Sequence, residues 1–202
     1  MEYTRAFLAY DTLCRIAAEI PENGERLLEQ CEEEAHELER TLSMFDPDSE
    51  LSRLCRDIRP GEAVPVSETL YTFLEQNLEI CRLSGGAFDP TVGPLVKLWN
   101  FLSEQPRVPS DKCIRDALDR VGYQHISLNR QTRTVAFDIP QIGLDPGAAG
   151  KGFALGLAVD RLRSGGVRQA VLDYGGNLFV LGAHQDVKGR TRPWKVAIRD
   201  PD

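Results

Sequence analysis

The stretch Asp145-Pro-Gly-Ala-Ala-Gly-Lys-Gly152 lies where the residue pattern of the chain changes. After it, apolar residues recur at helical spacing as far as Ser164-Gly165-Gly166, where we expect the helix to end. Before it, residues 125–138 are typical of two strands joined by the turn Asn129-Arg-Gln-Thr132. A glycine-rich turn that joins a hairpin to a helix favours a domain in which strands and helices are mixed.

The pattern on both sides of this centre extends the mixed assignment. Residues 7–20 combine β-branched and aromatic side chains and are expected to start a sheet, and three further strands are expected over Gln169–Asp173, Asn177–Leu181 and Trp194–Arg199. Residues 23–41 predict an amphipathic helix, because apolar positions recur every three or four residues. Those positions are Leu27, Cys31, Ala35, Leu38 and Leu42.

Three serines are expected to cap further helices. Ser49, after the turn Asp46-Pro47-Asp48, begins a short helix, Ser67 begins one that ends at Ser84-Gly85-Gly86, and Ser110 begins one closed by Gly122. The prolines between them predict loops at 60–65 and 106–109. The chain is therefore predicted to fold as a single α+β domain over residues 1–202.

Composition and charge exclude several classes of protein. The chain has 202 residues, of which 42% are hydrophobic and 27% charged, as in ordinary globular proteins. Its longest apolar run, residues 152–159, is far shorter than the roughly 20 residues that cross a bilayer, and no secretory signal opens the chain. We therefore expect a protein that is cytoplasmic as given, or one that has already been processed. The net charge is −7, and residues 1–50 hold 14 acidic and 4 basic side chains, so nucleic acid is a poor candidate partner.

The five cysteines and three histidines form no recognisable metal motif. The cysteines lie at least 17 residues apart, without a CxxC pair, and the simplest interpretation is that they are reduced thiols. His36, His125 and His184 are scattered and are expected to be surface or core residues rather than ligands.

The glycine-rich turn itself suits phosphate binding, because small residues let the backbone approach a ligand and a helix start presents unpaired N–H groups. An ordinary tight turn is the competing interpretation. The spacing fits neither a P-loop nor a dinucleotide fingerprint. Asp145 and Asp89 could each be a turn residue or could organise Mg²⁺, and spacing does not choose between these roles.

Four segments, taken together and in this order, resemble the ApbE-type flavin transferases. They are Met44-Phe-Asp-Pro-Asp-Ser-Glu-Leu-Ser-Arg-Leu-Cys55, Gly86-Ala-Phe-Asp-Pro-Thr-Val-Gly-Pro-Leu-Val-Lys-Leu-Trp99, Leu144-Asp-Pro-Gly-Ala-Ala-Gly-Lys-Gly-Phe-Ala154 and Leu172-Asp-Tyr-Gly-Gly-Asn177. The resemblance implies an ApbE-like (T-fold-like) α+β domain with mixed or antiparallel sheets. It also implies FAD as substrate and Mg²⁺ as cofactor, with FMN transferred to a Thr or Ser hydroxyl of an acceptor flavoprotein and AMP released.

The same resemblance assigns site residues position by position. It implies that Met44 contacts the nucleotide, that Ala87, Phe88 and Asp89 form a loop that holds FAD, and that Asp145 and Lys151 contact FAD. It further implies that the main-chain oxygen of Ala148 is a ligand of Mg²⁺. No residue is assigned as catalytic.

The chain departs from the family pattern at several points. Cys55 stands where the family usually has Asn facing the nucleotide, and Gly150 and Gly156 stand where Ala and an acidic residue are common. The family also continues well past the chain's last expected strand, and that stretch normally brings a histidine-containing segment and most magnesium ligands, so we expect weak Mg²⁺ binding and slow transfer from this chain alone. A non-catalytic flavin-binding module, or an FAD pyrophosphatase that releases FMN and AMP, are the alternatives. Family members are often exported or anchored to a membrane.

Overall fold

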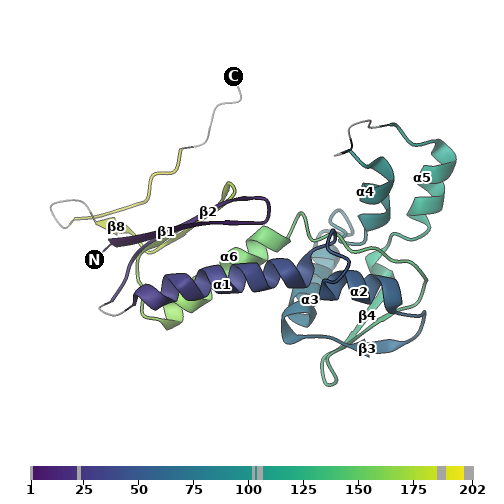
Figure 1. Cartoon of the computed structure of the whole chain (residues 1–202), viewed down its shortest axis with the longest axis horizontal. Coiled ribbons are helices and arrows are strands. Elements are labelled where there is room, and N and C mark those ends of the chain that lie inside the picture. The colour runs from purple at the N-terminus through teal and green to yellow at the C-terminus, as the bar shows by residue number, and fades with distance from the viewer. Residues whose placement is uncertain (1, 22–23, 102, 104–106, 186–189, 198–202) are drawn as a thin grey trace. The chain divides into compact units, whose positions relative to one another are not determined.

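The computed structural model describes residues 2–21, 24–101, 103, 107–185 and 190–197, and these group into two compact units. The first unit contains residues 1–37 and 151–202, and the second contains residues 38–150. Both combine helices with antiparallel sheets (Figure 1), so the predicted α+β class is confirmed. That the two units form a single domain stays a prediction.

A four-stranded antiparallel sheet is the centre of the first unit. Its strand order is β1-β2-β6-β7, which places the two ends of the sequence side by side. Residues 7–20, predicted to start the sheet, contain most of a hairpin whose turn, Tyr10-Asp11, has φ angles of 56° and 54°. Two consecutive positive φ angles are typical of a type I′ hairpin turn. The strands are β1 (Glu2–Ala9), β2 (Thr12–Glu19), β6 (Ala170–Tyr174) and β7 (Asn177–Leu181).

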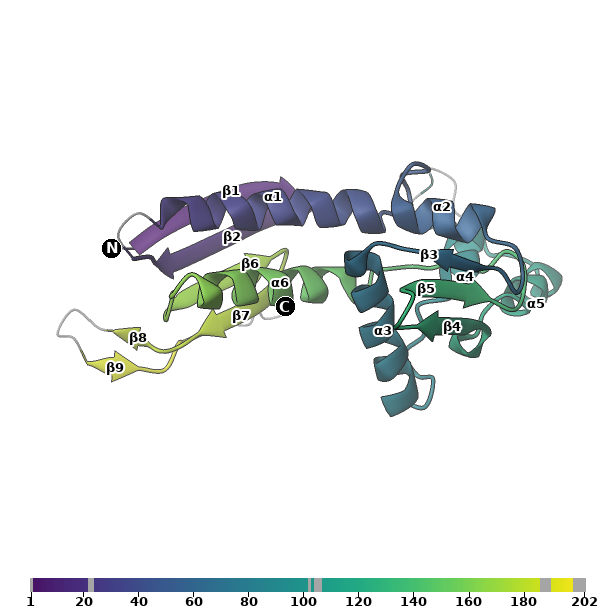
Figure 2. The same cartoon turned by 90° about the horizontal axis from the view of Figure 1, so that it is seen from below.

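Two helices, α1 (Glu25–Leu42) and α6 (Gly150–Ser164), run along the same face of this sheet (Figures 1 and 2). Strand residues alternate between the two faces, so Cys14, Ile16 and Ala18 of β2 are all buried beneath the helices. The predicted helix over residues 23–41 is confirmed, although Leu28 is the buried residue of its first turn and Leu27 is only half-buried.

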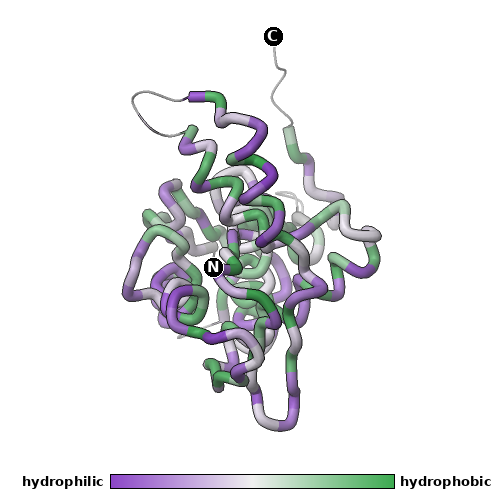
Figure 3. Tube along the Cα trace, turned by 90° about the vertical axis from the view of Figure 1, so that its right-hand side faces the viewer, coloured by the Kyte–Doolittle hydropathy of each residue, from purple (hydrophilic) through white to green (hydrophobic). Residues whose placement is uncertain are grey.

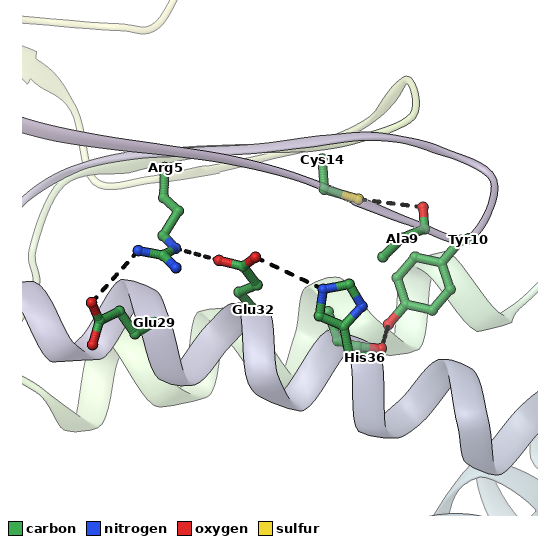
Figure 4. Close-up of polar contacts among 8 residues, drawn as sticks. Arg5, Ala9, Tyr10, Cys14, Glu29, Glu32 and His36 are labelled. Atoms are coloured by element: carbon green, nitrogen blue, oxygen red, sulfur yellow. Dashed lines mark hydrogen bonds and ion pairs between the residues drawn. The ribbon is translucent and has the colours of Figure 1, made fainter.

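Charged contacts also join α1 to its neighbours, and Figure 4 shows those that face the first hairpin. Arg5 of β1 forms an ion pair with Glu32 and lies 3.6 Å from Glu29. The Tyr10 hydroxyl donates a hydrogen bond of 2.8 Å to the carbonyl oxygen of Ala35. On α6, Arg161 pairs with Glu34. Part of the acidic excess of the first 50 residues is therefore neutralised within this unit.

The second unit contains α2 (Glu50–Asp57), α3 (Glu68–Leu83), α4 (Gly93–Trp99), α5 (Asp111–Leu118) and the sheet β3-β5-β4. The three predicted caps are confirmed: the hydroxyls of Ser49, Ser67 and Ser110 accept hydrogen bonds from the main-chain N–H three residues ahead. The sheet comprises β3 (Ala63–Pro65), β4 (Ile126–Asn129) and β5 (Thr134–Phe137). A 3₁₀ turn at Tyr123–His125 comes directly before β4.

Apolar residues of α3 and of this sheet form the core of the second unit, and α3 lies beside the sheet in both views (Figures 1 and 2). Phe73, Leu74, Val135 and Phe137 are at most 1% exposed. Hydrophilic and hydrophobic segments follow one another along α5 (Figure 3), as expected of a helix that buries one side. In α4, Lys97 is the single charged residue.

The structure differs from the sequence predictions in three places. The predicted loop over residues 60–65 ends in strand β3, whose Pro65 pairs with Thr134 at the sheet edge, a position that proline tolerates. The sequence pattern does not predict helix α4 (Gly93–Trp99), because the glycine and proline at its start are residues typical of turns. The strand expected over Trp194–Arg199 is absent from residues 194–197, residues 198–199 lie outside the described part, and a short pair β8 (His184–Gln185) and β9 (Thr191–Arg192) precedes it.

Candidate functional site

The second unit contains a cleft of about 620 Å³ between α2, α4 and the segment 141–144. This is within the usual range for small-molecule sites. We call it the Met44 cleft. It is lined by Met44, Leu51, Ser52, Cys55, Arg56, Pro94, Lys97, Leu98, Arg120, Gln141, Ile142, Gly143 and Leu144. Within the described part of the chain, the lining contains three basic side chains and no Asp or Glu.

The apolar part of the cleft is rigidly held. Met44, Leu51, Ile142 and Leu144 are each less than 9% exposed. The carbonyl oxygen of Ser43, next to Met44, accepts hydrogen bonds from the hydroxyls of Ser49 and Ser52, at 2.5 and 3.0 Å. The cap of α2 therefore fixes the backbone that carries Met44, and the cleft offers a preformed apolar surface.

The three basic residues of the cleft differ in how they are paired. Arg56 forms an ion pair of 2.8 Å with the neighbouring Asp57 and donates a hydrogen bond to the carbonyl oxygen of Pro47. Arg120 lies 3.4 Å from the side-chain oxygen of Gln141. Among the described residues, Lys97 has neither an ion-pair nor a hydrogen-bond partner. The cleft therefore carries a positive charge that its own side chains do not fully neutralise.

Cys55 is a half-buried thiol in the same cleft. Burial raises its pKa to about 11, although a hydrogen bond with the Leu144 backbone and the positive charge of Lys97 act in the opposite direction. The thiol is therefore protonated at neutral pH, and it offers a ligand only weak hydrogen bonding where the family usually presents an amide.

The loop that contains Ala87, Phe88 and Asp89 is held by its own aspartate. One carboxylate oxygen of Asp89 accepts hydrogen bonds from the N–H and hydroxyl of Thr91, at 2.8 and 2.6 Å, and the other accepts one from the N–H of Tyr123 at 2.9 Å. Thr91, which is fully buried, in turn accepts a hydrogen bond of 2.7 Å from the N–H of Gly122. Ala87 is exposed and Phe88 half-buried. Asp89 thus fixes the loop, and neither it nor its two predecessors line the Met44 cleft.

Main-chain contacts connect this loop to the wall of the cleft. The N–H of Asp145 donates a hydrogen bond of 2.7 Å to the carbonyl oxygen of Pro90, and the N–H of Gly93 donates one of 3.1 Å to that of Gly143. Gly93 and Gly143 approach so closely that a Cβ on Gly93 would lie 2.6 Å from the Gly143 oxygen. Of the residues that the resemblance assigns, Met44 lies in the cleft, and Asp89 and Asp145 are joined to it through these contacts.

The glycine-rich turn is open to solvent at its centre. Asp145 accepts a hydrogen bond of 2.7 Å from the N–H of Gly147, which shapes the turn, and Gly147 and Ala148 are exposed. Helix α6 begins at Gly150, so Lys151 lies on its first turn, half-buried and in the first unit. Exposure of the turn at a helix start agrees with the requirement for anion binding.

Magnesium finds no complete set of ligands in the described part of the chain. No group of three or more His, Cys, Asp or Glu side chains lies together there as a metal site would need. One carboxylate oxygen of Asp145 is already an acceptor for Gly147, and Ala148 would contribute only its main-chain oxygen. These residues therefore do not fit Mg²⁺ by themselves. No helix in the described residues has the length and apolar composition needed to cross a membrane.

Comparison with known proteins identifies the family. Residues 10–202 match the model of the ApbE family, and the chain belongs to that family. The FAD:protein FMN transferase of Treponema pallidum is 35% identical over 217 residues, which cover 99% of this chain and 58% of that protein. The FAD:protein FMN transferase of Rhodobacter capsulatus is 37% identical over 154 residues, covering 75% of this chain and 28% of that protein. The family predicted from the four sequence segments is confirmed.

Solved structures agree in fold. The flavin transferase ApbE from Vibrio cholerae has a TM-score of 0.87 at 27% identity and covers 100% of this chain and 64% of its own. The ApbE protein from Thermotoga maritima has a TM-score of 0.85 at 29% identity, with the same coverage. The chain spans between about a quarter and three fifths of the length of the two sequence relatives described above.

The basic residues of the Met44 cleft were not assigned from the sequence. Lys97 lies inside the second family-like segment, but its direction depends on a helix, α4, that was not predicted. Arg56 and Arg120 come from segments separated by more than 60 residues, and nothing local in the sequence places them together. A helical assignment of residues 93–99 would have placed Lys97 on the same side as Pro94 and Leu98.

Proposed function

We propose that this chain binds FAD and acts in the transfer of FMN from FAD to a Thr or Ser hydroxyl of an acceptor flavoprotein, with release of AMP. Membership of the ApbE family and the name shared by its relatives support this function. The observation that carries the proposal is the Met44 cleft, in which the described residues combine apolar walls with basic side chains and include no acidic one. FAD has matching parts, since its ring systems are apolar and its diphosphate is anionic.

In this proposal Met44 contacts the nucleotide, while the loop with Ala87, Phe88 and Asp89 is held in place for FAD by the bonds of Asp89. Asp145 shapes the glycine-rich turn, whose residues Gly147 and Ala148 are exposed just before the start of α6. Lys151, on that first turn, supplies a positive charge. In phosphoryl transfer, positive groups and N–H donors of this kind stabilise charge on the phosphate oxygens.

Magnesium dependence is the family's expectation and stays a prediction for this chain. Ala148 is the residue whose main-chain oxygen is expected to bind the ion. A cytoplasmic location likewise stays a prediction.

The test is to incubate the chain with FAD, Mg²⁺ and a purified flavoprotein acceptor. Transfer should give covalently bound flavin, seen as in-gel fluorescence at the mass of the acceptor, together with an equal amount of AMP. Replacing the acceptor Thr or Ser by Ala should abolish the fluorescent band. Free FMN with AMP would identify a pyrophosphatase, FAD binding without AMP would identify a flavin-binding module, and the absence of FAD binding would refute the proposal.

A further inference from the structure

Two of the three basic side chains of the Met44 cleft, Lys97 and Arg120, have no acidic partner among the described residues. The whole chain carries a net charge of −7, yet the described residues that line this cleft include three basic side chains and no carboxylate. Arg56 is paired with Asp57, and Arg120 contacts Gln141. Lys97 alone among the three has no polar partner within the described residues. An unpaired cation in a concave surface attracts anions more strongly than one on a flat surface.

The geometry of α4 directs Lys97 into the cleft. Pro94, Lys97 and Leu98 all line it, and a spacing of three and four residues places them on one side of the helix. The charge of Lys97 acts on the Cys55 thiol, which lowers the pKa of Cys55 against the larger effect of burial. Lys97 of α4 and Cys55 of α2 therefore line the same cleft, close enough for the charge of the lysine to act on the thiol.

The helix that carries Lys97 is fixed at both ends. Its first N–H, on Gly93, donates to the carbonyl oxygen of Gly143, and the N–H of Asn100 donates to that of Val96. Asn100 closes the helix in the left-handed conformation, with φ of 41°. Since the backbone is held, only the lysine side chain must become ordered when a ligand binds.

We propose that Lys97 is an FAD-binding residue that contacts a phosphate of the dinucleotide and makes the Met44 cleft selective for the charged nucleotide over the uncharged nucleoside. The proposal rests on the proposed function, and it adds a residue outside the set assigned by resemblance. A lysine ammonium suits this role because it binds phosphate as a compact point charge with three donors. Cys55, which lines the same cleft, is protonated and uncharged, so it does not compete with a phosphate for the Lys97 ammonium. A carboxylate at the position of Cys55 would compete.

The variants that test the proposal remove or keep the charge. Lys97→Met keeps a long unbranched side chain without the charge, and Lys97→Arg keeps the charge. Lys112→Met on α5 is the matched control, because Lys112 is exposed and does not line the cleft. Circular dichroism should show the same melting curve for all three, since each replaced side chain is exposed.

Binding of FAD and of adenosine is then measured by calorimetry at low and moderate salt. Lys97→Met should weaken FAD binding about tenfold or more, as expected when a charge-assisted hydrogen bond is lost, and change adenosine binding less than about twofold. It should also reduce the salt dependence of FAD binding, while Lys97→Arg and Lys112→Met stay near the wild type. Equal losses for FAD and adenosine, or equal affinities for Lys97→Met and Lys112→Met, would overturn the proposal.

A second measurement locates the ligand. In a Cys113→Ser background, which removes the exposed thiol, FAD should protect Cys55 from alkylation by iodoacetamide. FAD that binds without protecting Cys55 lies outside the cleft, and this outcome would refute the role of Lys97 while leaving the proposed function standing. A wild-type chain that binds no FAD would refute both.

Discussion

The Thr91 hydroxyl gives the sharpest test of how the loop beside the cleft is held. Thr91 is fully buried, donates to Asp89 and accepts from the N–H of Gly122. Thr91→Val keeps the shape but removes both bonds and leaves the N–H of Gly122 without this partner. A neutral bond contributes about 1 kcal/mol and one to a carboxylate about 1.5 to 3 kcal/mol, so we expect a loss of about 2 to 4 kcal/mol in the free energy of unfolding.

Thr91→Ser is the matched variant, because it keeps the hydroxyl and loses one buried methyl group. That loss should cost only about 1 kcal/mol. Urea unfolding followed by circular dichroism measures the difference. With a denaturant dependence of about 2 kcal/mol per molar, Thr91→Val should unfold at about 1 to 2 M less urea than the wild type. A valine variant as stable as the serine variant would show that the two hydrogen bonds of the hydroxyl do not hold this loop.

Three further results are expected. Gly93→Ala should destabilise the chain by about 1 to 3 kcal/mol, because its Cβ would lie 2.6 Å from the oxygen of Gly143. Gly156→Ala should stabilise the chain by about 0.5 to 1 kcal/mol, because no atom lies within 4 Å of the added Cβ. Urea midpoints that fail to move in opposite directions would contradict this contrast. Iodoacetamide should modify Cys55 far more slowly than a free thiol at pH 8, because the pKa of Cys55 is raised to about 11. The rate of modification should rise about tenfold per pH unit up to pH 10. A rate independent of pH would count against the burial of this thiol. Burial also raises the pKa of Cys31 to about 12 and that of Cys81 to about 11, so the folded state keeps these protons after the unfolded chain has lost them. The contribution of these two thiols to stability should therefore be constant well below pH 9, and stability should fall between pH 9 and about 12. A stability that rises over this interval, measured by urea unfolding, would contradict the argument.

Much of the fold follows from local patterns in the sequence. The serine caps at 49, 67 and 110 were predictable because each cap is a contact between residues three apart. The hairpin of β4 and β5 was predictable because Asn129 shapes its own turn. Its side-chain oxygen accepts hydrogen bonds from the main-chain N–H groups of Gln131 and Thr132. The order β1-β2-β6-β7 was not, since it depends on pairing β2 with a strand about 155 residues later.

The candidate site likewise has parts that the sequence predicts and parts that only the fold creates. The four family-like segments were visible in the sequence, and the first two contribute Met44 and Lys97 to one cleft. The bonds of Asp89 to Thr91 are local and agree with the turn role that the sequence allowed. The bond from Asp89 to Tyr123 and the cluster of Arg56, Lys97 and Arg120 could not be predicted, because each joins segments that only the folded chain brings together.

The contact between Gly93 and Gly143 limits how the binding surface can change. The backbone of Gly93 contacts the backbone of Gly143 directly, and any side chain on Gly93 would push these two segments apart. The residues next to Gly143 therefore form a wall whose position is set by main-chain atoms. New ligand preferences, in natural variants or in engineered ones, should arise from substitutions of the cleft residues on α2 and α4 that are not buried, such as Ser52, Cys55 and Lys97.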